Sequence, residues 1–296
     1  MAERKRRKNV DSRSSGGRSQ HFRSGLSILP SLFTVGNIFC AYYSVMSTLN
    51  GKWDKAAVAI GVGYILDGLD GRVARLTGTS TEFGAQLDSL ADVLTFGIAP
   101  AILAFAWGIP GGANGPGLNP TALTPIQQHI RSGGWLMTFG FVICGALRLA
   151  RFNVQAQKPI DSTSKRYFVG LPIPAGAGLI ASIIHFSNEP ISADNVVASS
   201  LWCLLIGITA FLMISTVRYH NFKELGIVSR RPRVALVLAA MMIALIFSYS
   251  EYMLLILAVV YASSGPVAKL VQVVRRLRLP ATAPREPAPM EVRREH

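Results

Sequence analysis

The chain has 296 residues, of which 50% are apolar and only 16% are charged, and its formal net charge is +14. An ordinary soluble domain carries about 25% charged residues and lacks repeated apolar segments of about 20 residues, so this composition excludes a soluble globular protein. All three cysteines lie inside apolar segments, which excludes a disulfide framework and a structural zinc site. The composition therefore indicates an integral membrane protein.

Apolar segments long enough to cross about 30 Å of hydrocarbon recur along the chain. They predict an all-α membrane bundle of about eight transmembrane helices, over residues 28–49, 55–75, 85–108, 133–153, 170–187, 196–216, 234–249 and 252–272. Only Glu251 interrupts the last apolar stretch. A single helix through residues 234–262 would overshoot the bilayer, so we expect a tight hairpin at this point.

Lysine and arginine test this topology, because cytoplasmic loops are enriched in them. With eight crossings and a cytoplasmic N-terminus, 27 of these 30 residues fall on the cytoplasmic side. Both termini are therefore predicted to be cytoplasmic. The chain then divides into a disordered basic tail (1–25), a transmembrane domain (26–272) and a cytoplasmic C-terminal tail (273–296). The basic tail is expected to face anionic lipid, with no nucleic acid as partner.

Four aspartates occupy two short segments that this topology brings to one depth. Asp67 and Asp70 lie three residues apart near the end of the second helix. Asp88 and Asp92 lie four residues apart near the start of the third helix. Each pair projects from one helix face, and the short polar link makes the two helices antiparallel neighbours. The four carboxylates are therefore expected to converge.

So much negative charge within a membrane requires a cationic ligand. One charged side chain at the centre of a membrane helix costs about 2.5 to 3.5 kcal/mol, and clustered carboxylates also repel one another. Oxygen-only clusters suit Mg²⁺ or Mn²⁺, which keep coordination sites open for phosphate oxygens. The leading hypothesis is a two-metal phosphoryl-transfer site. A cation-coupled membrane transporter is the alternative from another class, and a purely structural scaffold would give no reason to gather four acids.

The spacing Asp-x2-Asp-Gly-x2-Ala-Arg-x8-Gly-x3-Asp-x3-Asp over residues 67–92 resembles the signature of the CDP-alcohol phosphotransferase superfamily. The resemblance implies that Asp67, Asp70 and Asp88 hold two divalent ions. It implies that Asp92 is both a metal ligand and the general base toward an acceptor hydroxyl. It also implies contacts with a CDP-linked lipid at four further positions, Gly71, Ala74, Arg75 and Gly84.

Further segments resemble the membrane-embedded phosphatidylserine synthase branch of that superfamily. The opening Leu-Pro-x3-Thr-x2-Asn of residues 29–37 matches the branch apart from Ser31, where Asn is common, and it implies that Thr34 and Asn37 meet the CDP-lipid. Residues 147–153 and 168–175 resemble later segments of the branch. The resemblance implies transfer of the phosphatidyl group from CDP-diacylglycerol to L-serine, with release of CMP. It also implies a homodimer in a bacterial inner membrane, surrounded by membrane lipids, with the active site facing the cytoplasm.

Polar residues at the cytoplasmic end of the fourth helix are the expected acceptor contacts. Arg148, Arg151 and Asn153 offer hydrogen-bond donors able to hold a small carboxylate at the depth of the aspartates. The same arginines also satisfy the positive-inside rule, and that interpretation stays open. With Lys165 and Arg166 they could form a basic pocket, so glycerol 3-phosphate and inositol phosphate, together with choline, remain alternative acceptors.

Overall fold

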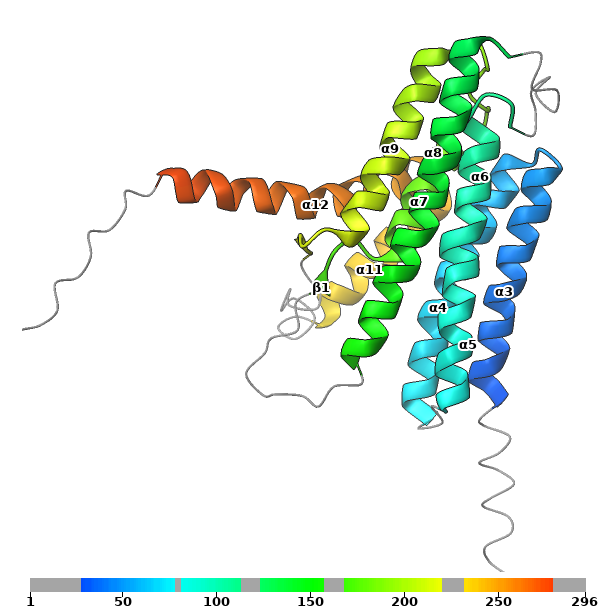
Figure 1. The fold of residues 1–296 in the computed structure, drawn as a ribbon. Helices are drawn as coiled ribbons and strands as arrows, with labels where there is room; N and C mark the ends of the chain where they lie inside the picture. The colour runs from blue at the N-terminus through cyan, green and yellow to red at the C-terminus, as the bar shows by residue number, and fades with distance from the viewer. Residues whose placement is uncertain (1–27, 78–80, 113–122, 157–167, 220–231, 279–296) are drawn as a thin grey trace, which may run out of the picture.

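A computed structural model describes residues 28–77, 81–112, 123–156, 168–219 and 232–278 of the chain (Figure 1). Its helices are α3 (Ile28–Leu49), α4 (Trp53–Thr77), α5 (Glu82–Asp92), η1 (Val93–Ile98), α6 (Ala99–Gly108), α7 (Pro125–Ala156), α8 (Ile173–Ser187), α9 (Val196–Ile214), α11 (Pro232–Ser248) and α12 (Ser250–Arg278). Each predicted segment coincides with a helix, where α5, η1 and α6 form one continuous rod. The all-α membrane class is therefore confirmed.

Five helical segments of the described residues are long and apolar enough to cross a membrane, judged by length and composition: 32–49, 82–108, 125–155, 196–214 and 250–271. Helix α4 has 25 residues but carries several charged side chains. Helix α8 and the apolar part of α11 are shorter. The count of eight crossings and the cytoplasmic location of both termini stay predictions, since the predicted N-terminal tail and residues 279–296 lie outside the described residues.

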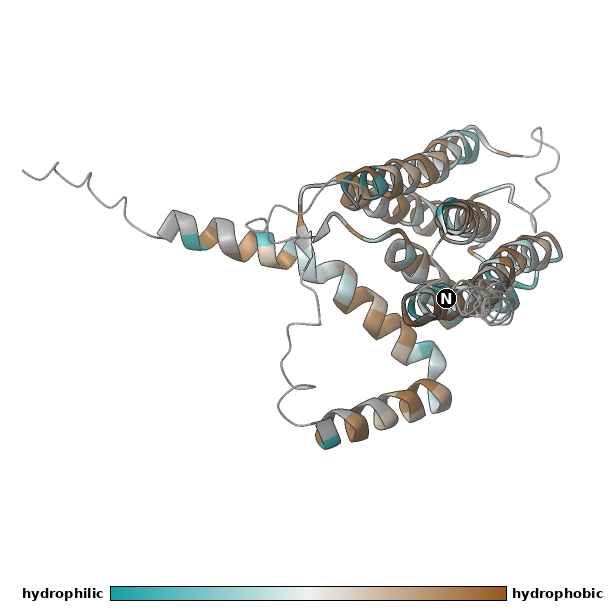
Figure 2. Cartoon of the chain, turned by 90° about the horizontal axis from the view of Figure 1, so that it is seen from below, coloured by the Kyte–Doolittle hydropathy of each residue, from teal (hydrophilic) through white to brown (hydrophobic). Residues whose placement is uncertain are grey.

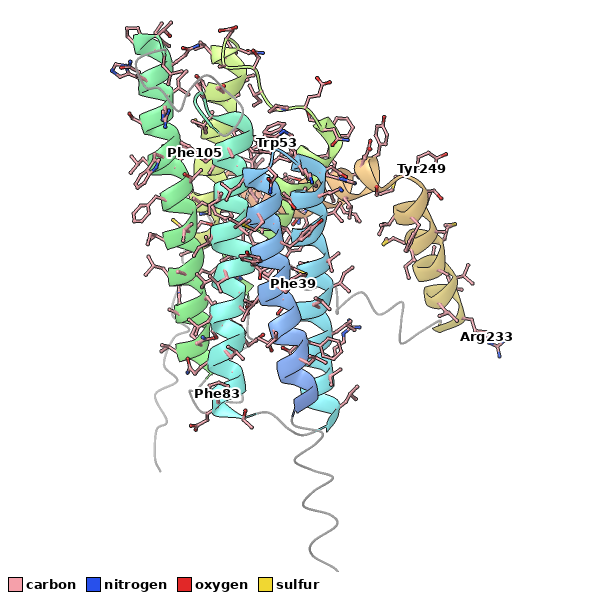
Figure 3. The ribbon with its side chains drawn as sticks, turned by 90° about the vertical axis from the view of Figure 1, so that its right-hand side faces the viewer. Phe39, Trp53, Phe83, Phe105, Arg233 and Tyr249 are labelled. Atoms are coloured by element: carbon pink, nitrogen blue, oxygen red, sulfur yellow. The ribbon has the colours of Figure 1, made fainter. Side chains whose placement is uncertain are left out.

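The outer surface of the bundle is apolar. Leu32 on α3, Phe211 on α9 and Phe247 on α11 are 63%, 72% and 88% exposed. Figure 2 shows hydrophobic residues along most of the length of the helices, and Figure 3 shows side chains such as Phe39 projecting from the ribbon. An apolar surface of this extent is unfavourable in water and favourable against lipid chains. The surface therefore agrees with the membrane class.

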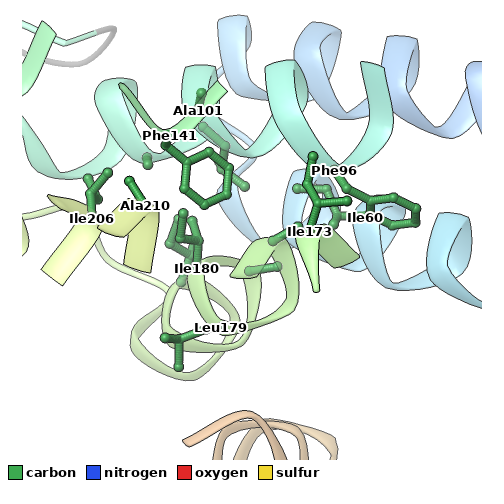
Figure 4. Packing of buried hydrophobic residues seen from close by; sticks show 14 of the residues in the cluster. Ile60, Phe96, Ala101, Phe141, Ile173, Leu179, Ile180, Ile206 and Ala210 are labelled. Carbon is green, nitrogen blue, oxygen red and sulfur yellow. The ribbon is translucent and has the colours of Figure 1, made fainter. Parts of the chain in front are cut away.

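A buried apolar core joins the helices from within. Ile60 of α4, Phe96 of η1 and Phe141 of α7 are fully or almost fully buried, and Ile173 and Ile180 of α8 pack into the same cluster (Figure 4). Helix α3 packs most extensively against α4, and α7 against α9. As a result, the end of α4, the start of α5 and the end of α7 lie at one end of the bundle (Figure 1).

Several boundaries differ from the predicted ones for local reasons. Helix α7 begins at Pro125 rather than 133, because proline is well suited to the first turn of a helix. Helix α8 begins at Ile173 rather than 170, because Gly170 has a positive φ of 86° and Pro172 has extended backbone. Helix α12 continues to Arg278, six residues beyond the predicted end. Only Tyr249 separates α11 from α12, so the predicted break is confirmed.

A short antiparallel ladder was not predicted. Strand β1 (Phe168–Val169) pairs with β2 (Arg218–Tyr219), with Phe168 opposite Tyr219 and Val169 opposite Arg218. The N–H of Gly170 also donates to the carbonyl of Val217 at 2.8 Å. Each strand has only two residues, which is too few for an alternating strand pattern to be recognised in the sequence. The ladder ties the start of α8 to the end of α9.

The rod α5–η1–α6 contains one stretch of π-helix immediately after Asp92. Within it the N–H of Ala99 donates to the carbonyl of Leu94, five residues earlier. Thr95 and Phe96 in this stretch are buried, and the Thr95 hydroxyl donates to the main-chain carbonyl of Asn37 on α3 at 3.0 Å. Single π turns inside α-helices are rare, and those that do occur are often found at functional sites. This one lies directly beside the acidic residues.

A polar clamp joins three helices at the opposite end of the bundle from the aspartates. Nδ1 of His185 on α8 lies 2.5 Å from Oδ1 of Asp54 on α4. Nε2 of the same ring lies 3.0 Å from Oγ of Ser250 on α12. Both ring nitrogens are therefore satisfied, as the near-complete burial of His185 requires. The clamp fixes the start of α12 against α4 and α8.

Replacing His185 with Phe is expected to lower stability without impairing chemistry. The variant loses both hydrogen bonds and leaves Ser250 without that partner, which typically costs about 1 to 3 kcal/mol. Thermal unfolding in detergent micelles should show a lower Tm, while kcat of the folded fraction is unchanged. His129→Gln is the matched control, because His129 is exposed at the start of α7. An unchanged Tm for the His185 variant would contradict the clamp.

Candidate active site

Three carboxylates from two helices meet at the end of the bundle. Asp67 of α4 and Asp88 and Asp92 of α5 each present an oxygen, and these three oxygens all lie within 4.8 Å of one another. All three residues are half-buried. Mg²⁺ binds oxygen at about 2.0 to 2.1 Å and Ca²⁺ at about 2.3 to 2.6 Å, so oxygens on opposite sides of one ion lie about 4 to 5 Å apart. The group therefore has the spacing and the donor type that could hold a divalent cation.

One oxygen in this group lacks any partner within the described part of the chain. Oδ1 of Asp92 is buried and accepts no hydrogen bond there. Burying a carboxylate oxygen without a hydrogen-bond partner costs free energy. The position of this oxygen among the other carboxylates therefore indicates a bound ligand that would interact with it. This observation fits the residues to a metal ion independently of the sequence motif.

The fourth aspartate, Asp70, is not one of the three residues whose oxygens lie within 4.8 Å of one another, and its role as a metal ligand stays a prediction. Asp70 is 6% exposed and accepts a hydrogen bond from the hydroxyl of Thr34 on α3. Residues three apart on a helix differ by about 60° in direction, so Asp67 and Asp70 can point to different neighbours. Asp67 turns to α5 and Asp70 to α3. Thr34, predicted to meet the CDP-lipid, is thus brought to an acid of the motif.

Asn37 occupies a buried position one turn further along α3. Its side chain is 1% exposed, and neither its Oδ1 nor its Nδ2 has a hydrogen-bond partner among the described residues. It lies against Gly63 of α4, where an added Cβ would be 2.9 Å from the Asn37 Oδ1 and 2.6 Å from Cγ2 of Thr95. Glycine is therefore required there for close approach of α3, α4 and η1. An unpaired buried amide is a suitable partner for a polar ligand.

The two glycines of the motif have different surroundings. An added Cβ on Gly71 would meet no atom of the described chain within 4 Å, so packing does not explain this glycine and space beside it is open. Gly84 has a local role instead, because its N–H donates to Oγ1 of Thr81, the N-cap of α5, at 3.0 Å. Ala74 and Arg75 lie in the last turns of α4, and the placement of their side chains lies outside the described part.

The predicted acceptor contacts on α7 separate into three environments. Arg148 is half-buried, and its Nε is buried without a hydrogen-bond partner in the described part of the chain. Arg151 is exposed. Asn153 donates from Nδ2 to Oγ of Ser89 at 2.9 Å, which joins α7 to α5 beside Asp88. Asn153 therefore holds two helices together, and Arg148 is the residue with unused donor capacity.

Residues that the motif does not specify complete this region. Ser89 is adjacent to Asp88 in sequence, yet its bond to Asn153 crosses between helices and leaves no sequence signal. Tyr261 of α12 stacks on Tyr219 of β2, with ring centroids 5.7 Å apart. Tyrosine in an apolar helix is common, so its spacing alone could not have singled it out.

The profile of the CDP-alcohol phosphatidyltransferase family matches residues 27–211, which include the whole acidic motif. The chain belongs to this family. The predicted superfamily is thereby confirmed, and the transporter alternative receives no support. The CDP-alcohol phosphatidyltransferase match ends before α11 and α12, so Tyr261 lies outside it.

Curated relatives agree on one activity. The chain is 35% identical over 200 residues to the CDP-diacylglycerol–serine O-phosphatidyltransferase of Helicobacter pylori, covering 67% of this chain and 74% of the relative. It is 30% identical over 201 residues to the Bacillus subtilis protein of the same name, covering 67% of this chain and 93% of the relative. The Saccharomyces cerevisiae protein of that name is 39% identical over 173 residues, covering 55% of each chain.

Proposed function

We propose that this enzyme transfers the phosphatidyl group of CDP-diacylglycerol to the hydroxyl of L-serine, forming phosphatidylserine and CMP. The single observation that carries the chemistry is the meeting of Asp67, Asp88 and Asp92 oxygens within 4.8 Å of one another. The similarity to relatives named for serine transfer supports the choice of acceptor. Serine is therefore preferred over glycerol 3-phosphate, inositol phosphate and choline.

The three carboxylates would hold the divalent metal, with Mg²⁺ or Mn²⁺ as the suitable ions and two as the proposed number. A cation held by these three residues would supply positive charge to neutralise the diphosphate oxygens and the departing CMP. Residues near the aspartates would make the remaining contacts with the CDP-lipid. The open space beside Gly71 admits part of the nucleotide, and the unpaired amide of Asn37 supplies polar contacts.

The transfer itself is a direct in-line displacement. The serine oxygen bonds to the phosphorus that carries the diacylglycerol, and the bond from that phosphorus to the bridging oxygen breaks with its electron pair leaving on CMP. Asp92 accepts the proton of the serine hydroxyl. The sequence offers no Ser/His, Cys/His or Lys nucleophile constellation beside the aspartates, so the proposed path has no covalent enzyme intermediate.

Arg148 is proposed to bind the serine carboxylate. Its guanidinium is planar and offers donors in a fork that matches a carboxylate, and one of these donors is buried without a partner in the described part of the chain. The proposed setting is a homodimer in a bacterial inner membrane, with the site open to the cytoplasm for serine to enter and CMP to leave.

An acceptor assay tests the proposed function. Purified protein is given CDP-diacylglycerol in mixed micelles with labelled serine, glycerol 3-phosphate, inositol phosphate or choline, and CMP and lipid product are counted. We expect equal amounts of CMP and phosphatidylserine with serine and no lipid product with the other three. Asp194→Asn, at an exposed loop position, is the control for non-specific effects. Turnover of glycerol 3-phosphate with serine inert would keep the family and reject the acceptor.

A further inference from the structure

Helix α12 ends in an amphipathic segment, the α12 end (residues 266–278). Its apolar residues recur at spacings of three and four residues: Val267, Leu270, Val271 and Val274. This spacing places them in a stripe along one side of the helix. The same segment carries four basic residues and no acidic one: Lys269, Arg275, Arg276 and Arg278. The α12 end therefore combines an apolar stripe with a strong positive charge.

The described part of the protein leaves the apolar stripe uncovered. Val267 and Leu270 are each more than half exposed, and the other two residues of the stripe are exposed as well. Among the described side chains of the α12 end, none is buried. Figure 1 and Figure 2 both show the α12 end projecting sideways from the bundle. Apolar surface of this kind is unfavourable in water and marks a site of interaction.

The α12 end begins where the helix is fixed to the rest of the protein. Tyr219 of β2 is nearly fully buried, and its hydroxyl donates to the carbonyl of Ala262 at 3.2 Å. An added Cβ at Gly265 would lie 2.5 Å from Cζ of Tyr219, so the ring rests directly on the helix at this glycine. The pairing of β2 with β1 holds Tyr219 from the other side. The base of the α12 end is therefore held in place, while its described side chains lie outside the packed core.

Helix α12 is too long for all of it to cross the hydrocarbon. Its 29 residues rise about 1.5 Å each, which gives about 43 Å against about 30 Å of hydrocarbon. The four basic residues also make the α12 end costly to bury among acyl chains. If the segment extended into water instead, its apolar stripe would stay exposed. Only the boundary between headgroups and acyl chains accommodates both sides of such a helix.

We propose that the α12 end is an interfacial helix that binds the surface of an anionic membrane leaflet. Its stripe enters the boundary between headgroups and acyl chains, and the exposed Lys269 and Arg275 meet the anionic headgroups. The positive charge favours anionic lipid over a second copy of this segment, because two such segments would repel each other. The proposal does not depend on which acceptor the enzyme uses.

Fluorescent labels at two positions test where the α12 end lies. Leu270→Cys and Gln272→Cys are made in full-length protein whose three native cysteines are alanine, and each is labelled with the dye NBD. The two positions differ by about 200° around a helix, so only position 270 belongs to the stripe. In phosphatidylcholine vesicles that contain phosphatidylglycerol, we expect iodide to quench the label at 270 several-fold less than the label at 272. Release of CMP by the labelled proteins shows that they are folded.

A charge variant tests the preference for anionic lipid. Lys269→Gln combined with Arg275→Gln removes two basic residues, and each removal should weaken the attraction to an anionic leaflet roughly fivefold. The label at 270 should then become accessible to iodide at a phosphatidylglycerol content that shields it in the parent protein. The matched control is Lys52→Gln combined with Lys55→Gln, which removes two exposed cations at the start of α4 and should leave the shielding unchanged.

Four results would each overturn the proposal. Equal shielding of both labels would place the α12 end within the hydrocarbon or the protein, and equal quenching would place it in water. Shielding that is the same without phosphatidylglycerol would reject the preference for anionic lipid. Shielding that disappears when each nanodisc holds one copy of the protein would show that a second copy covers the stripe.

Discussion

Replacing Asp92 with Asn is expected to lower kcat by roughly 100- to 10,000-fold, the range that loss of a general base typically gives. Asparagine keeps the shape of the side chain but accepts no proton and is a weaker metal ligand. Asp92 is also one of the three residues whose oxygens lie within 4.8 Å of one another, so the substitution removes a negative charge from the cation site. Initial rates of CMP release at saturating serine measure the effect.

The control for Asp92→Asn removes an acid elsewhere. Asp54→Asn alters an acid on α4 at the far end of the bundle, where it contacts His185, and should leave kcat near the wild-type value although Tm falls. The two variants together separate chemistry from stability. An Asp92→Asn protein that turns over as fast as wild type would reject both the proton-accepting role and the position of the site.

Removal of divalent cations is expected to abolish transfer. EDTA should reduce CMP release to the background rate, and added Mg²⁺ or Mn²⁺ should restore it, because the carboxylate group cannot neutralise a diphosphate without a cation. A second readout does not depend on turnover. An ion that binds only the folded protein raises its Tm, so adding Mg²⁺ or Mn²⁺ should raise the Tm of the metal-free wild-type protein.

The matched variant for the metal experiment is Asp88→Asn. It removes one of the three carboxylates without removing the proposed base, and the metal-dependent rise in Tm should become much smaller. Asp194→Asn should show the full wild-type rise, since Asp194 is exposed in a loop before α9. Transfer that continues at the normal rate in EDTA, with no change of Tm on adding metal, would show that the acids serve another purpose.

Much of the fold could be predicted from the sequence, because an apolar segment of about 20 residues is itself the signal for a membrane helix. The eight apolar segments match helices, and the single residue Tyr249 between α11 and α12 confirms the break inferred beside Glu251. The family signature identified the acidic helices because its spacing fixes which residues share a face. The start of α7 at Pro125 escaped prediction because its first turns are polar.

The finer geometry of the site could not be predicted, because it depends on how the helices rotate against one another. Asp70 and Asp67 are equivalent in the sequence pattern, yet only packing of α3 against α4 brings Asp70 to Thr34. Asn153 was expected to meet the acceptor, whereas its bond to Ser89 depends on the approach of α7 to α5. Contacts between distant segments leave no periodic signal.

The π turn after Asp92 has a consequence for how the rod α5–η1–α6 divides its tasks. Each residue advances an α-helix by about 100°, and a hydrogen bond that spans five residues instead of four accommodates one residue more per turn. The side chains of α5, which carries Asp88 and Asp92, and of α6 therefore follow different angular registers around the rod axis. The lower half can aim its carboxylates at α4 while the upper half independently turns Leu103 and Trp107 into the interior. One crossing thus directs its acidic residues and its buried apolar residues to different neighbours, with the change of phase made at the π turn.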